Sequence, residues 1–403
     1  MTTSTKGRRT LLQGAGLAAI IASSPGLMRQ ALAAEPIKIG IPCALTGSLA
    51  VVAEQTKRTA LLWARQVNAA GGINGRPVEL IIEDTGGNPA TCVRKVQQMV
   101  ERDGCRIFTG ITFSSETLAI MPRLAEWDAI YVACGNGDAS MTAEAFVPNF
   151  FRGNPSGPTE ARLLSLYIKD SGLKKFYAIG MDYSWGHSTV QAFEEEMKRN
   201  NIEFVGKVFA PTGTRDFSSY ITKIRQSGAD GLMMVQSGDD ANAFMTQAAQ
   251  YRLSDKVQMF TTLIELSTIK AVGEASKGVI GTMRYMSTYE YPENKKFVEM
   301  FTKEIKDTPD WNDGEQWKAL QFIGAALKKA NSIKSADLVQ ALNDMELDTI
   351  KGPAKFRACD HQSLEQGFVV RVDKIDGALL PVLVKKYPWD QITPACRKKN
   401  FDS

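Results

Sequence analysis

Two adjacent serines stand where a parallel sheet would place an anion-binding group. Ser114 and Ser115 follow the apolar stretch 107–111 and precede a segment with helical periodicity that runs to about residue 127. Backbone N–H groups at the start of a helix, together with a hydroxyl, form a natural site for a carboxylate. The same residue types are also common helix caps. The pattern therefore predicts either an anion site or simple capping at this position.

The residue types also raise the possibility that the protein is a hydrolase. Residues 186–190 read Gly-His-Ser-Thr-Val, which begins like a hydrolase nucleophile elbow but lacks its final glycine. The chain has two histidines, His187 and His361, and His187 adjoins Ser188, which is not the geometry of a catalytic triad. So few histidines also disfavour a zinc site. We expect no enzymatic activity, no metal and no cofactor.

The length of the chain indicates two domains, and its charge excludes one class of partner. Its 403 residues suit two domains of about 150 to 200 residues. Without the four basic residues of the first 33, 44 basic residues face 44 acidic ones. A nucleic-acid-binding protein would show a basic excess or basic clusters, so no nucleic-acid partner is expected.

The N-terminus has the organisation of an export signal. Arg8 and Arg9 precede an apolar stretch over 11–22 that is too short to span a bilayer, and Ala31 and Ala33 supply the small residues of a cleavage site. This order predicts a signal peptide over 1–33, with the arginine pair indicating the twin-arginine route, and a periplasmic location.

Export permits disulfides among six cysteines. Cys92 and Cys105 flank a predicted helix and would lie roughly 20 Å apart, which is too far for a bond. Cys359 and Cys396 flank the last predicted strand pair, where a disulfide is plausible. Cys43 and Cys134 stand at strand ends, where buried free thiols are the alternative.

Strand and helix patterns alternate along most of the chain. Strands are predicted at 37–41, 78–82, 107–111 and 130–133, and, after a breaker-rich segment at 154–158, at 175–181, 203–209, 231–235, 257–262 and 278–283. Helical patterns lie between them, and the chain closes with an antiparallel pair at 366–373 and 379–387. This rhythm predicts an α/β protein with two parallel sheets covered by helices on both faces. Ligands of such sheets bind beyond the carboxyl ends of the strands.

Several motifs, in order, resemble those of one family. They are Leu45-Thr46-Gly47, the run Asn-Ala-Ala-Gly-Gly-Ile-Asn-Gly-Arg-Pro-Val at 68–78, and the segments 110–117, 182–186, 214–218, 352–353 and 360–362. Over 36–390 the chain resembles periplasmic substrate-binding proteins of the leucine/isoleucine/valine-binding type. The resemblance implies a type I periplasmic-binding-protein fold with two lobes and three hinge crossings. We assign 36–154 with 286–352 to the N-terminal lobe and 155–285 with 353–403 to the C-terminal lobe.

The resemblance also implies a ligand site between the lobes. The solute carboxylate would be held by Ser114 or Ser115 and by the loop Gly135-Asn136-Gly137, where the family's threonine hydroxyl is missing. Tyr183 and Trp185 would cover the body of the ligand. Ser237 and the acid Glu265 would complete the site in the second lobe. Leu263 competes with Glu265 for the family's acidic position, Asp239 and Asp240 are alternative acids, and Val51 and Val52 stand near the family's tyrosine.

The predicted function follows from this site. We expect a monomer that captures a small carboxylate by lobe closure and delivers it to an ABC permease and ATPase. The favoured ligand is a branched-chain or other apolar amino acid. An aromatic or aliphatic acid without an ammonium group is the alternative, since the segment at 360–362 is reminiscent of relatives that bind such acids. Presentation of a ligand to a sensor also stays open.

Overall fold

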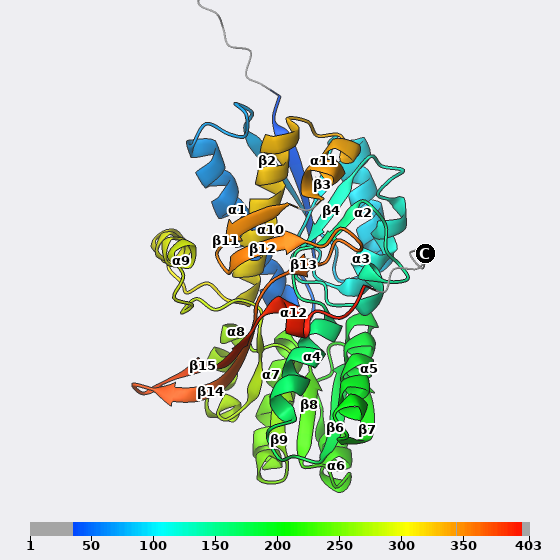
Figure 1. The fold of residues 1–403 in the computed structure, drawn as a ribbon, viewed down its shortest axis with the longest axis vertical. Coiled ribbons are helices and arrows are strands. Elements are labelled where there is room, and N and C mark those ends of the chain that lie inside the picture. The colour runs from blue at the N-terminus through cyan, green and yellow to red at the C-terminus, as the bar shows by residue number, and fades with distance from the viewer. Residues whose placement is uncertain (1–34, 344, 397–403) are drawn as a thin grey trace, which may run out of the picture. The chain divides into compact units, whose positions relative to one another are not determined.

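The first of two large sheets is built from the N-terminal third of the chain. The structure, a computed structural model, describes residues 35–343 and 345–396. Five parallel strands form the first sheet in the order β2-β1-β3-β4-β5 (Figure 1). They are β1 (Ile37–Cys43), β2 (Val78–Asp84), β3 (Ile107–Phe108), β4 (Ile130–Ala133) and β5 (Phe150–Arg152).

Helices cover both faces of this sheet because its strands are apolar on both sides. On one face, α1 (Ala50–Ala69), α10 (Trp311–Ala330) and α11 (Ser335–Leu342) pack on residues such as Ile39 and Val132. On the other face, α2 (Pro89–Glu101) and α3 (Ser114–Ile120) pack on Phe108 and Tyr131. We refer to this sheet with its helices as the first lobe.

The second sheet has seven strands in the order β15-β14-β10-β9-β8-β6-β7. Five are parallel, and the last two strands of the chain add an antiparallel edge. The strands are β6 (Lys175–Met181), β7 (Glu203–Ala210), β8 (Gly231–Val235), β9 (Gln258–Thr261), β10 (Ile280–Met283), β14 (Gly367–Ile375) and β15 (Ala378–Tyr387).

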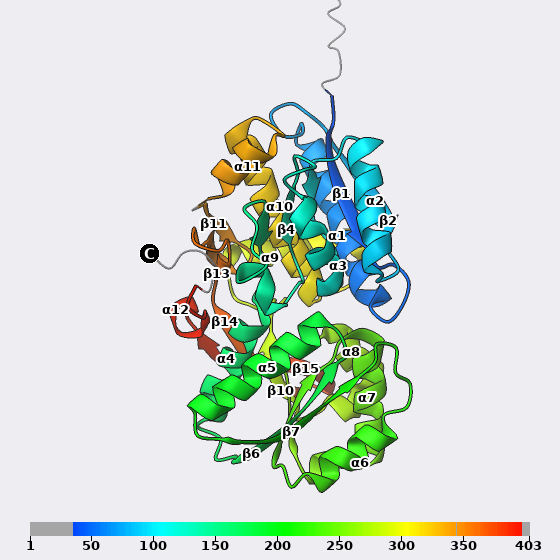
Figure 2. The same ribbon diagram turned by 90° about the vertical axis from the view of Figure 1, so that its right-hand side faces the viewer.

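Helices lie on both faces of the second sheet (Figure 2), and an apolar cluster fills the space beneath each set. Ala178 of β6 points to α4 (Gly157–Ile168) and α5 (Ser184–Arg199), whereas its neighbour Ile179 points to α6 (Ser218–Gln226), α7 (Gly238–Gln250) and α8 (Leu266–Val272). This alternation follows from the two-residue period of a strand. We refer to this sheet with its helices as the second lobe.

Both sheets share one strand order, and that order positions the site. In each lobe the second parallel strand lies outside the first, and the third lies on the first strand's other side. The connections therefore leave in opposite directions between β1 and β3, and again between β6 and β8. Ligands bind beyond the carboxyl ends of the strands at such switch points. Ser114 follows β3, and Trp185 and Ser237 follow β6 and β8.

The chain passes between the lobes three times, and the third passage comes later than predicted. Residues 153–156 and 284–291 make the first two passages. The small sheet β11 (Glu346–Thr349), β12 (Gly352–Phe356) and β13 (Ser363–Leu364) then precedes β14. Phe356 packs on Phe151 and Phe322 in the first lobe. Residues 352–364 thus join that lobe, whereas the sequence-based boundary placed the passage at 352–353.

Four charged side chains are buried beside the third passage. Lys318 contacts Glu315 (2.6 Å) and Glu365, and Lys351 contacts Glu315 (2.8 Å) and Glu365 (3.0 Å). Each lysine therefore lies between two carboxylates, and we refer to the four residues as the charge quartet. α9 (Pro292–Ile305) follows the second passage and packs on α1 through Phe297 and Leu62.

Most predicted elements are confirmed, and so are the cysteine predictions. The strand β5, the small sheet and four helices were not predicted; the helices are α4, α8, α11 and the four-residue α12 (Trp389–Ile392). Cys359 and Cys396 form a disulfide, and the other four cysteines are buried free thiols. The predicted signal peptide lies outside the described residues. Within the described part of the chain, no helix combines the length and the apolar character needed to cross a membrane.

Candidate functional site

Ser114 holds a loop and does not cap its helix. The N-terminus of α3 is completed by Glu116, whose Oε2 accepts the N–H of Phe113 (3.3 Å). The Ser114 hydroxyl oxygen instead accepts the N–H groups of Gly137 (3.2 Å) and Asp138 (3.4 Å). Both bonds use oxygen lone pairs, so the hydroxyl hydrogen can still donate to a carboxylate. The structure thus brings Ser114 and the 135–137 loop together. The neighbouring Ser115 is half-buried on the same first turn.

The glycine at 137 is required by the indole of Trp185. A Cβ at Gly137 would lie 2.5 Å from Cδ1 of Trp185 and 3.2 Å from Nη2 of Arg284. A Cβ at Gly135 would lie 3.3 Å from Oδ1 of Asn312 and 3.5 Å from the ring of Trp311. This loop therefore carries no side chain toward the second lobe. That close approach is a physical reason why the family's threonine hydroxyl is missing here.

Asn136 is placed differently from the expectation. Its side chain is fully buried beneath the loop. Its Oδ1 accepts the hydroxyl of Tyr131 (2.8 Å), and its Nδ2 donates to the carbonyl of Ile111 (3.2 Å). These bonds fix the loop to the first lobe, so its amide does not face the second lobe.

Aromatic rings from both lobes meet at the switch points. The ring of Tyr183 contacts that of Phe113 edge-on, with centroids 5.3 Å apart, and lies 5.9 Å from Trp185. Burial raises the pKa of the Tyr183 hydroxyl. Trp185 is 4% exposed, and its Nε1 has no hydrogen-bond partner in the described structure. These rings, together with Trp311, form an aromatic wall that can cover an apolar ligand body.

The second lobe brings one buried acid, Glu265, to the candidate ligand site. It is 2% exposed, and its Oε1 accepts the hydroxyl of Ser237 (2.6 Å) and the indole N–H of Trp311 (3.2 Å). Its Oε2 accepts the hydroxyl of Thr268 (2.7 Å) and the N–H of Gly238 (3.2 Å). Burial raises the pKa of the Glu265 carboxyl, and these neutral donors oppose that shift only in part. Ser237 and Glu265, which were both predicted as site residues, are therefore joined directly by a hydrogen bond.

The alternative acids point elsewhere. Asp239 is exposed and pairs with Arg215 (3.7 Å). Asp240 accepts the N–H of Gly213 (2.9 Å) in a loop of the second lobe, and burial raises its pKa. Leu263 and Val52 are both buried in one apolar cluster. Val52, which stands near the family's tyrosine position, therefore belongs to an apolar surface.

Arg284 is a functional candidate that the sequence did not reveal. It follows β10, is buried, and donates to both carboxylate oxygens of Glu160 (2.7 and 2.9 Å). Its Nη1 donates to the carbonyl of Gly135 (2.8 Å), and its guanidinium lies 5.1 Å from the ring centre of Trp311. In the sequence, the one feature that could have indicated Arg284 is its position directly after the predicted strand at 278–283. The structure adds a cation next to the loop that Ser114 holds.

Buried polar atoms without partners gather around the same strand ends. They are Nε1 of Trp185, both amide atoms of Gln236 and Oδ1 of Asn312. Gln236 directly precedes Ser237 at the end of β8. Unpaired buried polar groups are costly and call for a partner. Their position next to the aromatic wall supports a ligand site between the two switch points.

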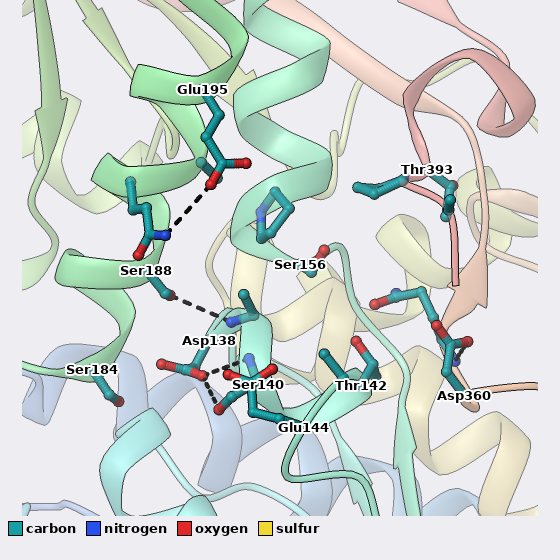
Figure 3. A pocket seen from close by; sticks show the side chains of 18 of the residues that line it. Asp138, Ser140, Thr142, Glu144, Ser156, Ser184, Ser188, Glu195, Asp360 and Thr393 are labelled. Carbon is teal, nitrogen blue, oxygen red and sulfur yellow. Dashed lines mark hydrogen bonds between the residues drawn. The ribbon is translucent and has the colours of Figure 1, made fainter. Parts of the chain in front are cut away.

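A cavity of about 510 Å³ adjoins these residues, since Asp138 and Ser184 in its wall are chain neighbours of Gly137 and Trp185 (Figure 3). Its walls include Asp138, Ser188 and Asp360, and none of the nine predicted site residues lines it. The expected organic-acid segment lies partly here, with Asp360 and Gln362 in the wall, while His361 stacks on Phe151 (4.0 Å).

Within the described residues, His187 and Ser188 have separate hydrogen-bond partners. His187 Nε2 contacts Asp182 Oδ1 (2.6 Å), while the hydroxyl of Ser188 donates to the Trp185 carbonyl (3.3 Å) and accepts the N–H of Ala139 (3.3 Å). The serine is therefore bonded to backbone groups on α5 and on the loop after Asp138. Its hydrogen-bond partners differ from those of an activated nucleophile.

Glu116 is expected to make the stability of the protein depend on pH. Burial raises the pKa of this carboxyl to about 7 from an ordinary 4.5. The folded chain thus takes up a proton between these values, and its free energy of unfolding falls as pH rises from about 4.5 to 7, by up to about 3 kcal/mol. Glu116→Gln should flatten this part of the profile. Urea unfolding of both proteins between pH 4.5 and 8 measures it, and parallel profiles would contradict the assignment.

The comparisons with known proteins identify the family. The sequence profile of the family described as "Periplasmic binding protein" matches residues 36–378. The chain belongs to the periplasmic binding protein family. A curated relative, Leu/Ile/Val-binding protein homolog 6 of Brucella abortus, is 24% identical over 87% of this chain and 91% of its own length. The resemblance drawn from the motifs is confirmed.

Two solved structures of periplasmic binding proteins show the fold. One is the leucine-, isoleucine-, valine-, threonine- and alanine-binding protein of Brucella ovis in its closed conformation, with a TM-score of 0.81, 22% identity, and coverage of 91% of this chain and 98% of that one. The other is a solute-binding protein from Rhodopseudomonas palustris in complex with 3,4-dihydroxybenzoic acid, with a TM-score of 0.82, 20% identity, and coverage of 88% and 98%. The two-lobed type I fold is confirmed. A third structure, an ABC transporter substrate-binding protein from Sphaerobacter thermophilus, has a TM-score of 0.80, 27% identity, and coverage of 88% of this chain and 98% of that one.

Proposed function

We propose that the protein binds a branched-chain or other apolar amino acid. The observation that carries the proposal is Glu265, a buried carboxylate whose four hydrogen-bond donors are all neutral. A buried carboxylate is stabilised most by a cation, and the ammonium of an amino acid supplies one. It would take the place of the Trp311 indole N–H, the donor that comes from the opposite lobe.

The other end of the ligand would lie on the first lobe. Its carboxylate would accept the hydroxyl hydrogen of Ser114, close to the Arg284 guanidinium. Charge-assisted hydrogen bonds of this kind are stronger than neutral ones. Trp185 and the apolar cluster around Val52 and Leu263 would enclose an apolar side chain. The names of the Brucella relatives, which refer to leucine, isoleucine and valine, support this ligand class.

An aromatic acid without an ammonium group is the second candidate. Two observations favour it: Glu265 has a complete set of donors without any ligand, and the rings of Phe113, Tyr183 and Trp185 form a wall suited to an aromatic body. The Rhodopseudomonas protein in complex with 3,4-dihydroxybenzoic acid supports this alternative.

The cellular role we propose is import from the periplasm. Residues 1–33 would direct export by the twin-arginine route, and the mature monomer would close its lobes on the ligand. The loaded protein would then dock on its permease and ATPase. No catalytic step and no metal or cofactor enters this scheme.

Calorimetric titration of the refolded, ligand-stripped mature chain separates the candidates. The panel contains leucine, valine, phenylalanine, benzoate, 4-hydroxybenzoate and 2-oxoisocaproate. The last is the matched control for leucine because it keeps the carboxylate and side chain and has a carbonyl oxygen in place of the ammonium. Binding of the amino acids alone supports the proposal. Binding of the benzoates or of 2-oxoisocaproate in preference to leucine favours the second candidate, and no binding across the panel would contradict both.

A further inference from the structure

Asp310 stands at the N-termini of two helices that belong to different lobes. In the first lobe it caps α10, with Oδ1 accepting the N–H of Trp311 (2.7 Å). The same oxygen accepts the N–H of Leu266 (2.9 Å), the first residue of α8 in the second lobe. Its Oδ2 accepts both the N–H (2.9 Å) and the hydroxyl (2.8 Å) of Ser267. One carboxylate therefore satisfies the otherwise unpaired N–H groups of both helices.

The surroundings of Asp310 make these bonds strong. The side chain is 3% exposed, and its Oδ2 also accepts Nε2 of Gln55 (3.1 Å) from α1. Negative charge is stabilised at a helix N-terminus, and here two termini converge on it. Hydrogen bonds to a charged acceptor away from water are also the strong ones. Asp310 is thus held by the first lobe while it binds the second.

The same segment reaches the proposed ligand site. Trp311, which follows Asp310, donates to Glu265, and Glu265 directly precedes Leu266. Residues 310–311 therefore hold residues 265–267 through four hydrogen bonds across the lobes. We refer to these contacts as the Asp310 latch.

Other contacts between the lobes include a buried one, from Nη1 of Arg284 to the carbonyl of Gly135 (2.8 Å), and several nearer the surface. Asp307 bridges Arg58 of the first lobe (3.0 Å) and Lys270 of the second (2.9 Å). These three side chains are partly exposed, so solvent screens the pairs and each contributes little. The N–H of Asp239 also donates to the carbonyl of Ser48 (3.1 Å). The buried latch, with four hydrogen bonds, has more bonds than any of these other connections.

We propose that Asp310 is a positioning residue that closes the two lobes before a ligand arrives and sets Glu265 and Trp311 in register. Every bond of the latch joins protein groups, so closure by the latch needs no ligand. A binding-competent form that is already populated raises the apparent affinity in proportion to its population. The latch would thus set both the resting conformation and the strength of capture.

Small-angle X-ray scattering of the ligand-free protein tests the latch without any assumption about the ligand. The parent scattering should match the curve calculated from the closed structure. Asp310→Asn keeps one acceptor oxygen and places an amide NH₂ against the donors of Ser267 or Leu266. The ratio of closed to open protein should fall by about tenfold or more, which the measurement records as a larger radius of gyration.

A matched control separates the latch from simple capping. Asn88 caps α2 by accepting the N–H of Thr91 (3.0 Å), and this contact lies wholly within the first lobe. Asn88→Ala should lower the thermal midpoint and leave the radius of gyration unchanged. Ser267→Ala removes one bond of the latch and leaves the cap of α10 intact, so it decides the matter if Asp310→Asn does not fold. A parent that scatters as an open protein would overturn the proposal, as would latch variants whose scattering equals the parent's.

A second readout links the latch to recognition and rests on the proposed function. With leucine as the probe, Asp310→Asn should weaken binding by about tenfold, while Asn88→Ala should bind like the parent. If leucine does not bind the parent, the proposed function fails while the scattering result stands. If leucine binds the parent and Asp310→Asn equally well, Glu265 does not depend on Asp310 and the positioning role is wrong.

Discussion

Glu265→Gln is expected to weaken leucine binding by about a hundredfold or more, because removing one partner of a buried charge pair costs about 3–5 kcal/mol. The amide keeps the size of the side chain and removes the charge that would face the ammonium. Its NH₂ group would also meet one of the four donors that now point at the carboxylate. Calorimetric titration with leucine measures the loss.

A second ligand and a control variant test whether the loss of affinity comes from the ammonium of leucine. Binding of 2-oxoisocaproate, which has no ammonium, should change far less than binding of leucine. Asp239→Asn removes an exposed acid close to Ser237 that pairs with Arg215, and it should leave leucine affinity unchanged. An equal loss for both ligands would mean that Glu265 shapes the site without pairing with an ammonium. No loss for leucine would place its ammonium elsewhere.

Lys318→Met is expected to lower the free energy of unfolding by about 3–5 kcal/mol, the largest loss of stability that we predict for a single change. It removes one of two cations from the charge quartet and leaves Glu315 and Glu365 with Lys351 alone. All four side chains are buried, so water cannot replace the missing charge. Urea unfolding at neutral pH measures the change.

Two further variants complete this experiment. Lys328→Met alters an exposed lysine on the same helix and should change stability by less than about 0.5 kcal/mol. Adding Glu315→Met to Lys318→Met restores neutrality and should recover part of the loss, since the Lys351–Glu365 pair remains. A Lys318 variant as stable as the Lys328 control would show that the quartet adds nothing to stability.

The sequence predicted the parallel strands because their apolar runs are bounded by glycine and polar residues. The strands 130–133, 175–181 and 231–235 were placed at their observed bounds. α4 was missed because residues 155–158, Pro-Ser-Gly-Pro, read as breakers. In the structure Ser156 caps the helix and Pro158 occupies its first turn. The boundary at 352 was wrong because Ala354 and Phe356 alternate like any strand, and only their packing shows which lobe they join.

Part of the candidate site follows from the sequence, where a residue's place after a strand determines the direction of its side chain. Ser114, Trp185 and Ser237 follow strands at the two switch points, and Glu265 follows the neighbouring strand β9. Asn136 has the same kind of position, but the buried hydroxyl of Tyr131 turns its amide inward. Trp311 and Asp310 could not be placed, since they reach the site from a helix start about 45 residues beyond Glu265. No local pattern indicates that one carboxylate would cap helices of two lobes.

The order of the segments along the chain also determines when each lobe can finish folding during synthesis. All five strands of the first sheet are made by residue 152, yet α10 and α11, which cover Ile39 and Val132, follow only after residue 310. The second sheet likewise waits for β14, whose Val369 and Val370 face its two apolar layers. A growing chain thus carries two sheets with uncovered apolar surface for most of its synthesis, and such surface favours aggregation. The last quarter of the chain completes both cores, so a product truncated before α10 would be expected to hold neither lobe in its native form.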